Sequence, residues 1–435
     1  MYSDIIWNIT LVLLEKKIKF DIIEFVHKYI FKSSSYLLLS QFLVKGFALL
    51  YSFFLAGNIG PDNFGTYSAA LAIFGLMSLF SDLGINRVLT RDIARDESEL
   101  PKLFSTAILL RAFSAAVSFL GLTIFFYLTD PSNLRFQLTT IALLSLIPQS
   151  IALSVDAILI ALKKISYSAV GFFLFNMVSF IVGSVLIFFE YGVYGAIIAF
   201  LAGQIFYAVV LIYFLAANKK IKFLPFDWRI AKGLLVKSWP YGILSAIGFA
   251  SFRIDTVILS FARGGAETGA YALAYRFFEA ATIIPVAFGT VLYPLFSEHH
   301  QNPETIKKLF KQSLLFGLFA GVGVAIAINL AVPLLNWFLS SFLPKGFAEA
   351  ASSLAILSLA LPFIFMHIPL GQLILSREAI LKKTILLYAF VFIINLTLML
   401  NIIPVYGYIG ASWITVAVEA LTFVCFLVYI RKKIV

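Results

Sequence analysis

The sequence has few charged residues and a single cysteine. Asp, Glu, Lys and Arg make up 13% of its 435 residues, against about 25% in an ordinary globular domain. Hydrophobic residues make up 61%, which is too many for a soluble surface and excludes intrinsic disorder. Because Cys425 has no partner in the chain, an intrachain disulfide scaffold is also excluded. The composition therefore indicates an integral membrane protein whose long apolar runs cross the bilayer as helices.

The sequence motifs of soluble enzymes are missing as well. The chain has no Walker loop, no GxGxxG motif after a strand, no HExxH and no CxxC. Without a nucleotide-binding element, a pump that uses ATP by itself is excluded. We therefore predict a protein that is not an enzyme and has no metal centre.

Apolar segments of sufficient length are spread over almost the whole chain. A transmembrane helix needs about 20 mostly apolar residues. Twelve segments satisfy this requirement, at 36–58, 66–91, 103–128, 136–161, 167–189, 192–217, 233–261, 268–296, 309–339, 347–375, 380–401 and 405–430. The sequence thus predicts an all-α polytopic membrane protein with about 12 transmembrane helices.

Basic residues are distributed unequally between the two sides of this topology. Lys and Arg number 26 on the side of the N-terminal segment and 3 on the opposite side, with 4 inside spans. Since cytoplasmic loops carry the excess of Lys and Arg, both termini are predicted in the cytoplasm and the protein in the cell membrane. The net charge of +11 is then explained by orientation, and no nucleic-acid partner is predicted. Residues 1–32 are predicted to form a cytoplasmic or interfacial segment.

Short motifs repeat in the two halves of the chain. YGVYGA at 191–196 begins the sixth span, and YGYIGA at 406–411 begins the twelfth. Gly65-Thr-Tyr67 and Gly269-Ala-Tyr271 begin the second and eighth spans. Because each half has an even number of spans, the halves have the same orientation and form a parallel repeat. We predict a first lobe at 33–217, a cytoplasmic linker at 218–232 and a second lobe at 233–435.

Ionisable residues inside spans are the main functional candidates, since burying one in a bilayer costs about 2.5–3.5 kcal/mol on insertion scales. Lys45, Arg253 and Arg276 lie deep in the first, seventh and eighth spans, and Arg111 lies in the third. Together they predict a central cationic cavity for an anionic group such as phosphate or pyrophosphate. For Arg276 the alternative is neutralisation by Glu279, three residues further along the same helix.

Oxygen-bearing side chains gather in the second half. Asp255, Asn395, Thr415 and Glu419 supply hard ligands at membrane depth, which suits coupling to Na⁺ or H⁺. Ordinary hydrogen bonds between helices are the alternative interpretation of the same residues.

The chain contains LLLSQ at 37–41, LAGNIGPDNFGTY at 55–67, FSDLGIN at 80–86, TRDIAR at 90–95 and the two YGxxGA motifs. With these motifs, residues 33–430 resemble the polysaccharide-biosynthesis flippases of the multidrug/oligosaccharidyl-lipid/polysaccharide exporter superfamily. The resemblance implies two six-helix lobes around a central cavity that opens alternately to each side. It also implies movement of undecaprenyl- or dolichyl-linked sugars between leaflets, with lipid-linked oligosaccharide and membrane lipid as partners and a monomeric protein.

Specific residues match the family in part. Related flippases carry cavity-facing cations in the first, seventh and eighth helices, which agrees with Lys45, Arg253 and Arg276. The cation in the first helix is Lys45. An Arg at this position could bind phosphate through two parallel hydrogen bonds, whereas the Lys ammonium is a point charge. Some relatives have a sodium site between helices seven, eleven and twelve, to which Asp255, Asn395 and Thr415 approximately correspond.

Two other transporter classes are alternatives. A multidrug or organic-cation antiporter of the same superfamily would share the fold, but its cavity would carry unpaired acids. A major-facilitator transporter is disfavoured because Asp82 is followed by Leu83 and Gly84 and not by the Arg of that family's loop. A scaffold without transport activity would not need charges at this depth.

Overall fold

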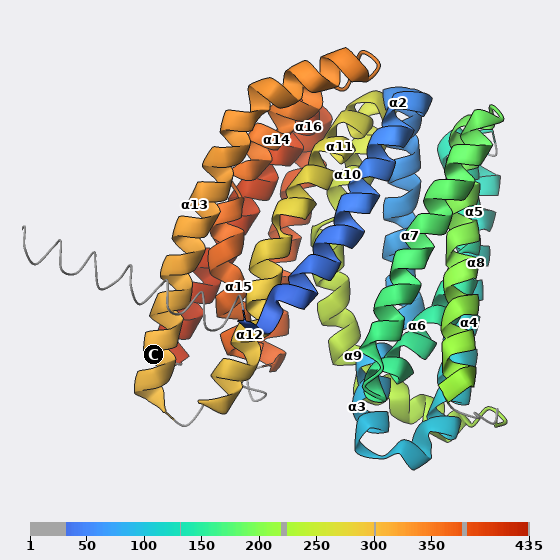
Figure 1. Cartoon of the computed structure of the whole chain (residues 1–435), viewed down its shortest axis with the longest axis vertical. Coiled ribbons are helices and arrows are strands. Elements are labelled where there is room, and N and C mark those ends of the chain that lie inside the picture. Colours follow the sequence, from blue (N-terminus) through green and yellow to red (C-terminus); the bar gives the residue numbers. More distant parts are fainter. Residues whose placement is uncertain (1–31, 131, 219–223, 300–301, 376–380, 434–435) are drawn as a thin grey trace, which may run out of the picture.

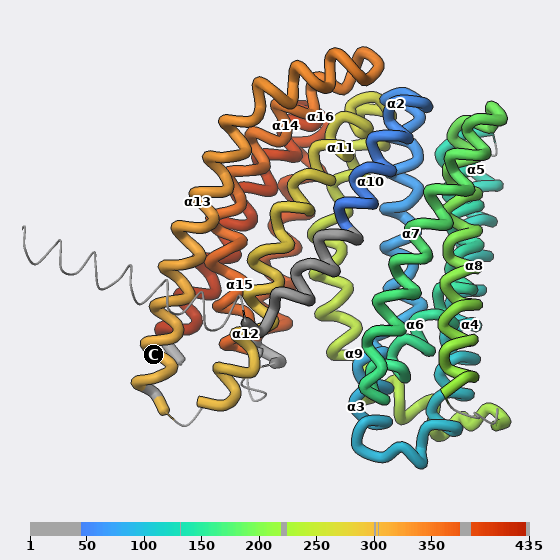
Figure 2. Tube along the Cα trace, viewed as in Figure 1, coloured from blue at the N-terminus to red at the C-terminus, as the bar shows by residue number. Residues whose placement is uncertain are grey.

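The computed structural model describes residues 32–130, 132–218, 224–299, 302–375 and 381–433, and every element within them is a helix (Figure 1). The helices form two lobes that lie side by side, as Figure 2 shows along the trace. The predicted fold class is thereby confirmed. Residues 1–31, which make up nearly all of the predicted N-terminal segment 1–32, lie outside the described part.

The first lobe is built from α2 to α8. A short 3₁₀ turn at Glu97–Glu99 links α3 to α4, and α6 packs against α3, α4 and α8. The helices are α2 (Lys32–Asp82), α3 (Ile85–Arg95), α4 (Leu100–Thr129), α5 (Leu134–Leu144), α6 (Leu146–Ala161), α7 (Ile165–Phe188) and α8 (Gly192–Asn218).

The second lobe is built from α9 to α16. Its helices are α9 (Trp228–Ser251), α10 (Ile254–Arg263), α11 (Gly265–Ala281), α12 (Ile283–Glu298), α13 (Pro303–Phe342), α14 (Glu349–Ser358), α15 (Leu361–Leu375) and α16 (Leu381–Lys433). Because α9 begins at Trp228, the last five residues of the predicted linker 218–232 are helical, which corrects that boundary.

Backbone breaks explain how these helices correspond to the predicted spans. Among the described residues, eight helices are long and apolar enough to cross a membrane, or ten if each bent pair counts as one span. Two of them, α2 and α16, each contain a non-helical glycine: Gly60 (φ 76°) and Gly407 (φ 57°). Dividing α2 and α16 at these glycines, whose positive φ other residues rarely adopt, gives the twelve predicted spans.

The two lobes touch closely at the end of the molecule where α2 breaks at Gly60, called the Gly60 end below. Here α2 crosses α11 through Gly65 and Gly269, and a side chain on Gly65 would lie 2.6 Å from the backbone nitrogen of Gly269. These glycines begin the same repeated motif in the two halves. The repeat therefore places matching positions against each other across the lobe interface, as expected for two lobes related by an axis along the membrane normal.

At the opposite end, α9 of the second lobe rests against α3 of the first. A side chain on Gly84, which follows α2 with φ 76°, would lie 2.6 Å from the carbonyl oxygen of Ser238. Nζ of Lys237 lies 3.2 Å from Oδ2 of Asp92. Partial burial acts to raise the pKa of Asp92, but hydrogen bonds from Arg91 and Lys237 hold the pKa of this carboxyl below its usual value. We call this end of the molecule, where α9 packs against α3, the α3 end.

Candidate functional site

A cavity of about 640 Å³ lies between the lobes. Its lining comes from α2, α6, α7 and α8 of the first lobe and from α9, α10 and α11 of the second. Its volume is in the range of about 300–1,000 Å³ that is usual for ligand sites. Lys45, Arg253 and Arg276, the three deep cations predicted to share a cavity, all line it, together with Glu279.

These four side chains form a compact group, called the charged wall below. Glu279 Oε1 lies 2.5 Å from Nη2 of Arg253, and its Oε2 lies 3.7 Å from Nη1 of Arg276. Nζ of Lys45 donates a hydrogen bond of 3.4 Å to the backbone carbonyl of Glu279. The wall thus has three cations and one carboxylate, which contacts Arg253 and Arg276, so it keeps an excess of positive charge. Intrahelical neutralisation of Arg276 by Glu279 is incomplete, because Glu279 contacts Arg253 more closely.

Backbone geometry places these side chains at the cavity. Arg253 stands at the break between α9 and α10, where the two helices bend by 44°. Its guanidinium carbon lies 5.9 Å from the ring centroid of Tyr275, a buried residue of α11. Arg276 and Glu279 follow on α11, three residues apart. A change in the α9–α10 bend would therefore move Arg253 relative to the other two charges.

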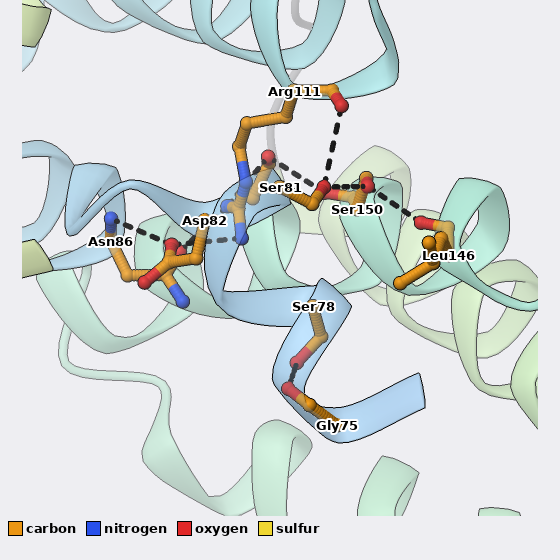
Figure 3. A network of polar contacts seen from close by, with 9 residues as sticks. Gly75, Ser78, Ser81, Asp82, Asn86, Arg111, Leu146 and Ser150 are labelled. Atoms are coloured by element: carbon orange, nitrogen blue, oxygen red, sulfur yellow. Dashed lines mark hydrogen bonds and ion pairs between the residues drawn. The ribbon is translucent and has the colours of Figure 1, made fainter. Parts of the chain in front are cut away.

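The sequence-based prediction that Arg111 lines the cavity is wrong. Its side chain is fully buried inside the first lobe (Figure 3). Nη2 of Arg111 lies 3.0 Å from Oδ1 of Asp82, and Nη1 donates to Asn86 Oδ1 at 2.8 Å and to Ser154 Oγ at 3.0 Å. These partners come from α2, α3 and α6. Arg111 therefore joins four helices of one lobe and does not line the cavity.

This placement predicts a stability effect. Arg111→Met should destabilise the protein by about 3 kcal/mol, the lower end of the range for buried pairs, because Asp82, which is 22% exposed, would lose its cationic partner. The double variant Arg111→Met with Asp82→Asn should recover part of the loss, since no unpaired carboxylate remains. Thermal unfolding in detergent measures both. Transport per folded molecule should remain close to that of the wild type, and its loss in a stable Arg111 variant would contradict a purely structural role.

Three of the four predicted coupling residues lie together in the second lobe. Asn395, Thr415 and Glu419 of α16 line a small pocket of about 60 Å³, with His367 of α15 opposite them. Oε2 of Glu419 lies 2.9 Å from Nδ1 of His367. Oδ1 of Asn395 is buried and has no hydrogen-bond donor among the described residues. The pocket therefore contains one acid, one imidazole and an unpaired amide oxygen.

Asp255, the fourth predicted coupling residue, lies apart from this pocket. It is 1% exposed, and its carboxylate accepts hydrogen bonds from the Tyr271 hydroxyl at 2.5 Å and the Thr256 amide at 2.6 Å. The Tyr271 hydroxyl also interacts with the side chain of Thr415, which lines the pocket. Asp255 is thus linked to the pocket through Tyr271, and does not contribute directly to its lining. In the described part of the chain, no three His, Cys, Asp or Glu side chains are arranged to hold a metal ion.

Sequence reasoning missed the part played by two residues of this region. It considered Glu279 only as a partner of Arg276 on the same helix. The closer contact of Glu279 with Arg253 joins two different spans, and spacing along one helix does not reveal it. His367 lies in the tenth predicted span, and an ionisable side chain at such depth is itself a signal of function. Tyr275 lines both the cavity and the small pocket, so it separates the two sites.

The fold and the cavity define a class of protein, a multi-span membrane protein with two six-helix lobes around a central cavity. Solved structures that share this fold include the two that follow. A multidrug-resistance MATE family transporter of the MOP superfamily, in an inward-facing conformation, matches with a TM-score of 0.74 and 15% identity over 89% of this chain and 94% of its own. The lipid II flippase MurJ, in an inward closed conformation, matches with a TM-score of 0.74 and 20% identity. This match covers 90% of this chain and 87% of the MurJ chain.

The chain belongs to the polysaccharide biosynthesis protein family, whose sequence profile matches residues 30–300. It is also 24% identical over 386 residues to a putative O-antigen transporter of Shigella flexneri, a match that covers 85% of this chain and 90% of the relative. The family resemblance predicted from the sequence motifs is thereby confirmed. The protein is a membrane transporter of the type found in polysaccharide biosynthesis.

Proposed function

We propose that the protein is a flippase that moves polyprenyl-(pyro)phosphate-linked oligosaccharide across the cell membrane by alternating access. The observation that carries this proposal is the charged wall, in which Lys45, Arg253 and Arg276 surround the single carboxylate of Glu279. Excess positive charge in a cavity between lobes favours an anionic group, and guanidinium groups suit phosphate oxygens. The family membership and the O-antigen transporter relative support the same substrate class.

The charged wall disfavours the alternative, an organic-cation antiporter. At 4 Å and an effective dielectric constant of about 20, two like unit charges repel each other by about 4 kcal/mol. A cationic substrate would meet three such charges, while the one carboxylate on this wall is already paired with Arg253. Glu419, whose close neighbour is the His367 imidazole and not a Lys or Arg, lies in the other pocket, which has only about 60 Å³ of space.

The charge distribution along the chain supports an orientation. With 26 basic residues on one side and 3 on the other, the α3 end faces the cytoplasm and both termini lie there. In this orientation, contact between α2 and α11 at the Gly60 end separates the cavity from the outside. The lipid tail stays in the bilayer, and the charged head group with its sugars crosses through the cavity.

Reconstitution into proteoliposomes tests the proposal. Undecaprenyl-pyrophosphate-linked oligosaccharide bearing a fluorescent sugar is expected to move from one leaflet to the other only in vesicles that contain the protein. Accumulation of an organic cation such as ethidium should be the same with and without it. Movement of ethidium together with absence of lipid movement would overturn the flippase in favour of the antiporter.

Coupling to Na⁺ or H⁺ is assigned to the small pocket of Asn395, Thr415, Glu419 and His367. An acid beside an imidazole suits a proton, and the unpaired amide oxygen suits a hard cation. Asp255 is given a structural role beside this pocket, because its oxygens already accept hydrogen bonds from Tyr271 and Thr256.

This assignment predicts different effects for the two acids. Lipid movement should depend on sodium or on pH in the wild type, and Glu419→Gln should abolish that dependence. Asp255→Asn should mainly lower stability and leave the dependence in place. The measurement is lipid movement with and without sodium across a pH series. Dependence that survives Glu419→Gln and disappears in Asp255→Asn would reassign the coupling site to Asp255.

A further inference from the structure

The side of the cavity formed by α6, α7, α8 and the adjoining part of α2 differs in chemistry from the charged wall. Its lining residues from α6, α7 and α8 carry no charge, and amide side chains alternate there with phenylalanine rings. We call this surface the neutral wall and define it by six residues: Tyr51, Ser68, Phe175, Asn176, Phe200 and Gln204. The cavity therefore has two poles, one positive and one neutral but able to form hydrogen bonds.

Three polar atoms of the neutral wall have no hydrogen-bond partner in the part of the chain that the structure describes. The Tyr51 hydroxyl, the Ser68 hydroxyl and Oε1 of Gln204 are all buried without a hydrogen bond among the described residues. Gln204 is 6% exposed and Ser68 8%, so bulk water does not reach most of either side chain. These buried atoms belong to residues that line the cavity. Since buried polar groups in proteins are normally hydrogen-bonded, their lack of partners indicates a ligand with matching polar groups, toward which the side chains would turn.

Aromatic rings complete the surface around these atoms. The rings of Phe175 and Phe200 meet edge to face, with centroids 5.9 Å apart, and Phe172 lies 5.7 Å from Phe175. The Asn176 amide nitrogen donates to the carbonyl of Phe172, which fixes this side chain on the same wall. Close packing of α7 on α8 at Gly203, where a side chain would meet Phe175 at 3.0 Å, holds the two helices together beneath the wall.

A ligand for such a surface needs apolar faces and hydroxyl or amide groups at its edges. A pyranose ring has both: its C–H face packs on an aromatic ring, and its hydroxyl or acetamido groups donate to an amide or hydroxyl oxygen. A phosphate group needs cations, and a polyprenyl chain would leave the three polar atoms unpaired. The chemistry of the neutral wall thus matches sugar residues better than either other part of a lipid-linked glycan.

We propose that the neutral wall is the subsite for the sugars next to the (pyro)phosphate, with Gln204 accepting a hydrogen bond from a sugar hydroxyl or acetamido group. This inference rests on the proposed function and adds a residue that determines specificity. The head group then lies across the cavity, with its phosphate on the charged wall and its first sugars on α7 and α8. Lys45 and Tyr51, six residues apart on α2, lie where the two subsites meet.

Binding of two probes to the purified protein in nanodiscs tests the inference. The probes are undecaprenyl pyrophosphate, which has no sugar, and undecaprenyl-pyrophosphoryl-N-acetylglucosamine. The wild type should bind the sugar-bearing probe about fivefold to tenfold more tightly, the value of one or two neutral hydrogen bonds. Gln204→Leu, similar in shape and without polar atoms, should remove this preference and leave affinity for the sugar-free probe within about twofold.

Two further variants make the result specific. Tyr51→Phe, which keeps the ring and loses the hydroxyl, should reduce the preference by a smaller amount. Gln312→Leu on α13, outside the cavity lining, should behave as the wild type does. Equal affinity of the wild type for both probes, or a full preference in Gln204→Leu, would overturn the sugar subsite. Failure of the wild type to bind either probe would instead overturn the proposed function.

Discussion

Replacing Arg276 with alanine is expected to abolish glycan export while the protein remains folded and inserted. Arg276 lines the central cavity on the charged wall and shares Glu279 with Arg253. Truncation of one partner in a charge-assisted contact costs about 2–5 kcal/mol, which lowers affinity for the head group at least about thirtyfold. The measurements are export of glycan in cells and binding of undecaprenyl pyrophosphate to the purified variant.

Comparison with related substitutions separates charge from geometry. Arg276→Lys should restore export only in part, because a point charge replaces a planar fork. Arg253→Ala also leaves Glu279 without its closest partner, so its effect combines two causes. The double variant Arg253→Ala with Glu279→Gln removes this complication and should still bind the head group weakly. Normal export by both single alanine variants at normal protein levels would contradict a cationic substrate site, although not the fold.

Much of this fold follows from local properties of the sequence. Apolar length predicts the spans, and the motifs that begin at Gly65 and Gly269 identify the repeat. The structure adds that these two glycines face each other. The bend between α9 and α10 at Arg253, where no proline stands, was not predicted, because hydropathy along one segment does not report such a break. The bend between α14 and α15 lies just before Pro362, a residue type that bends helices.

The candidate site was predicted less completely, for a related reason. The cost of placing a charge in a membrane identifies ionisable residues but not their partners. Arg111 and Arg276 look alike by this criterion. Arg111 is satisfied inside one lobe by Asp82, Asn86 and Ser154, which come from three other helices. Arg276 lines the cavity because α11 faces the other lobe. Only the three-dimensional arrangement distinguishes a structural cation from one that faces substrate.

Locking the two lobes together at the Gly60 end is expected to stop transport completely and reversibly. Alternating access requires α2 and α11 to separate there, and in this conformation Asp62 of α2 lies directly against Gly265 of α11. Asp62 and Ala266 are both exposed, so cysteines at these positions are accessible to reagents. A short bis-methanethiosulfonate linker applied to Asp62→Cys with Ala266→Cys, on a Cys425→Ser background, should join the lobes. Lipid movement should cease in proportion to the cross-linked fraction and return after reduction.

A matched pair within one lobe serves as the control for this lock. Glu267 of α11 and Glu349 of α14 interact electrostatically at the same end of the molecule, and both belong to the second lobe. Cysteines at these positions, cross-linked with the same reagent, should leave transport largely intact because they join helices that move together. Each single-cysteine variant should likewise remain active. Continued transport by the fully cross-linked Asp62–Ala266 variant would mean that the lobes do not part at the Gly60 end. The substrate would then cross by a route that leaves the α2–α11 contact closed.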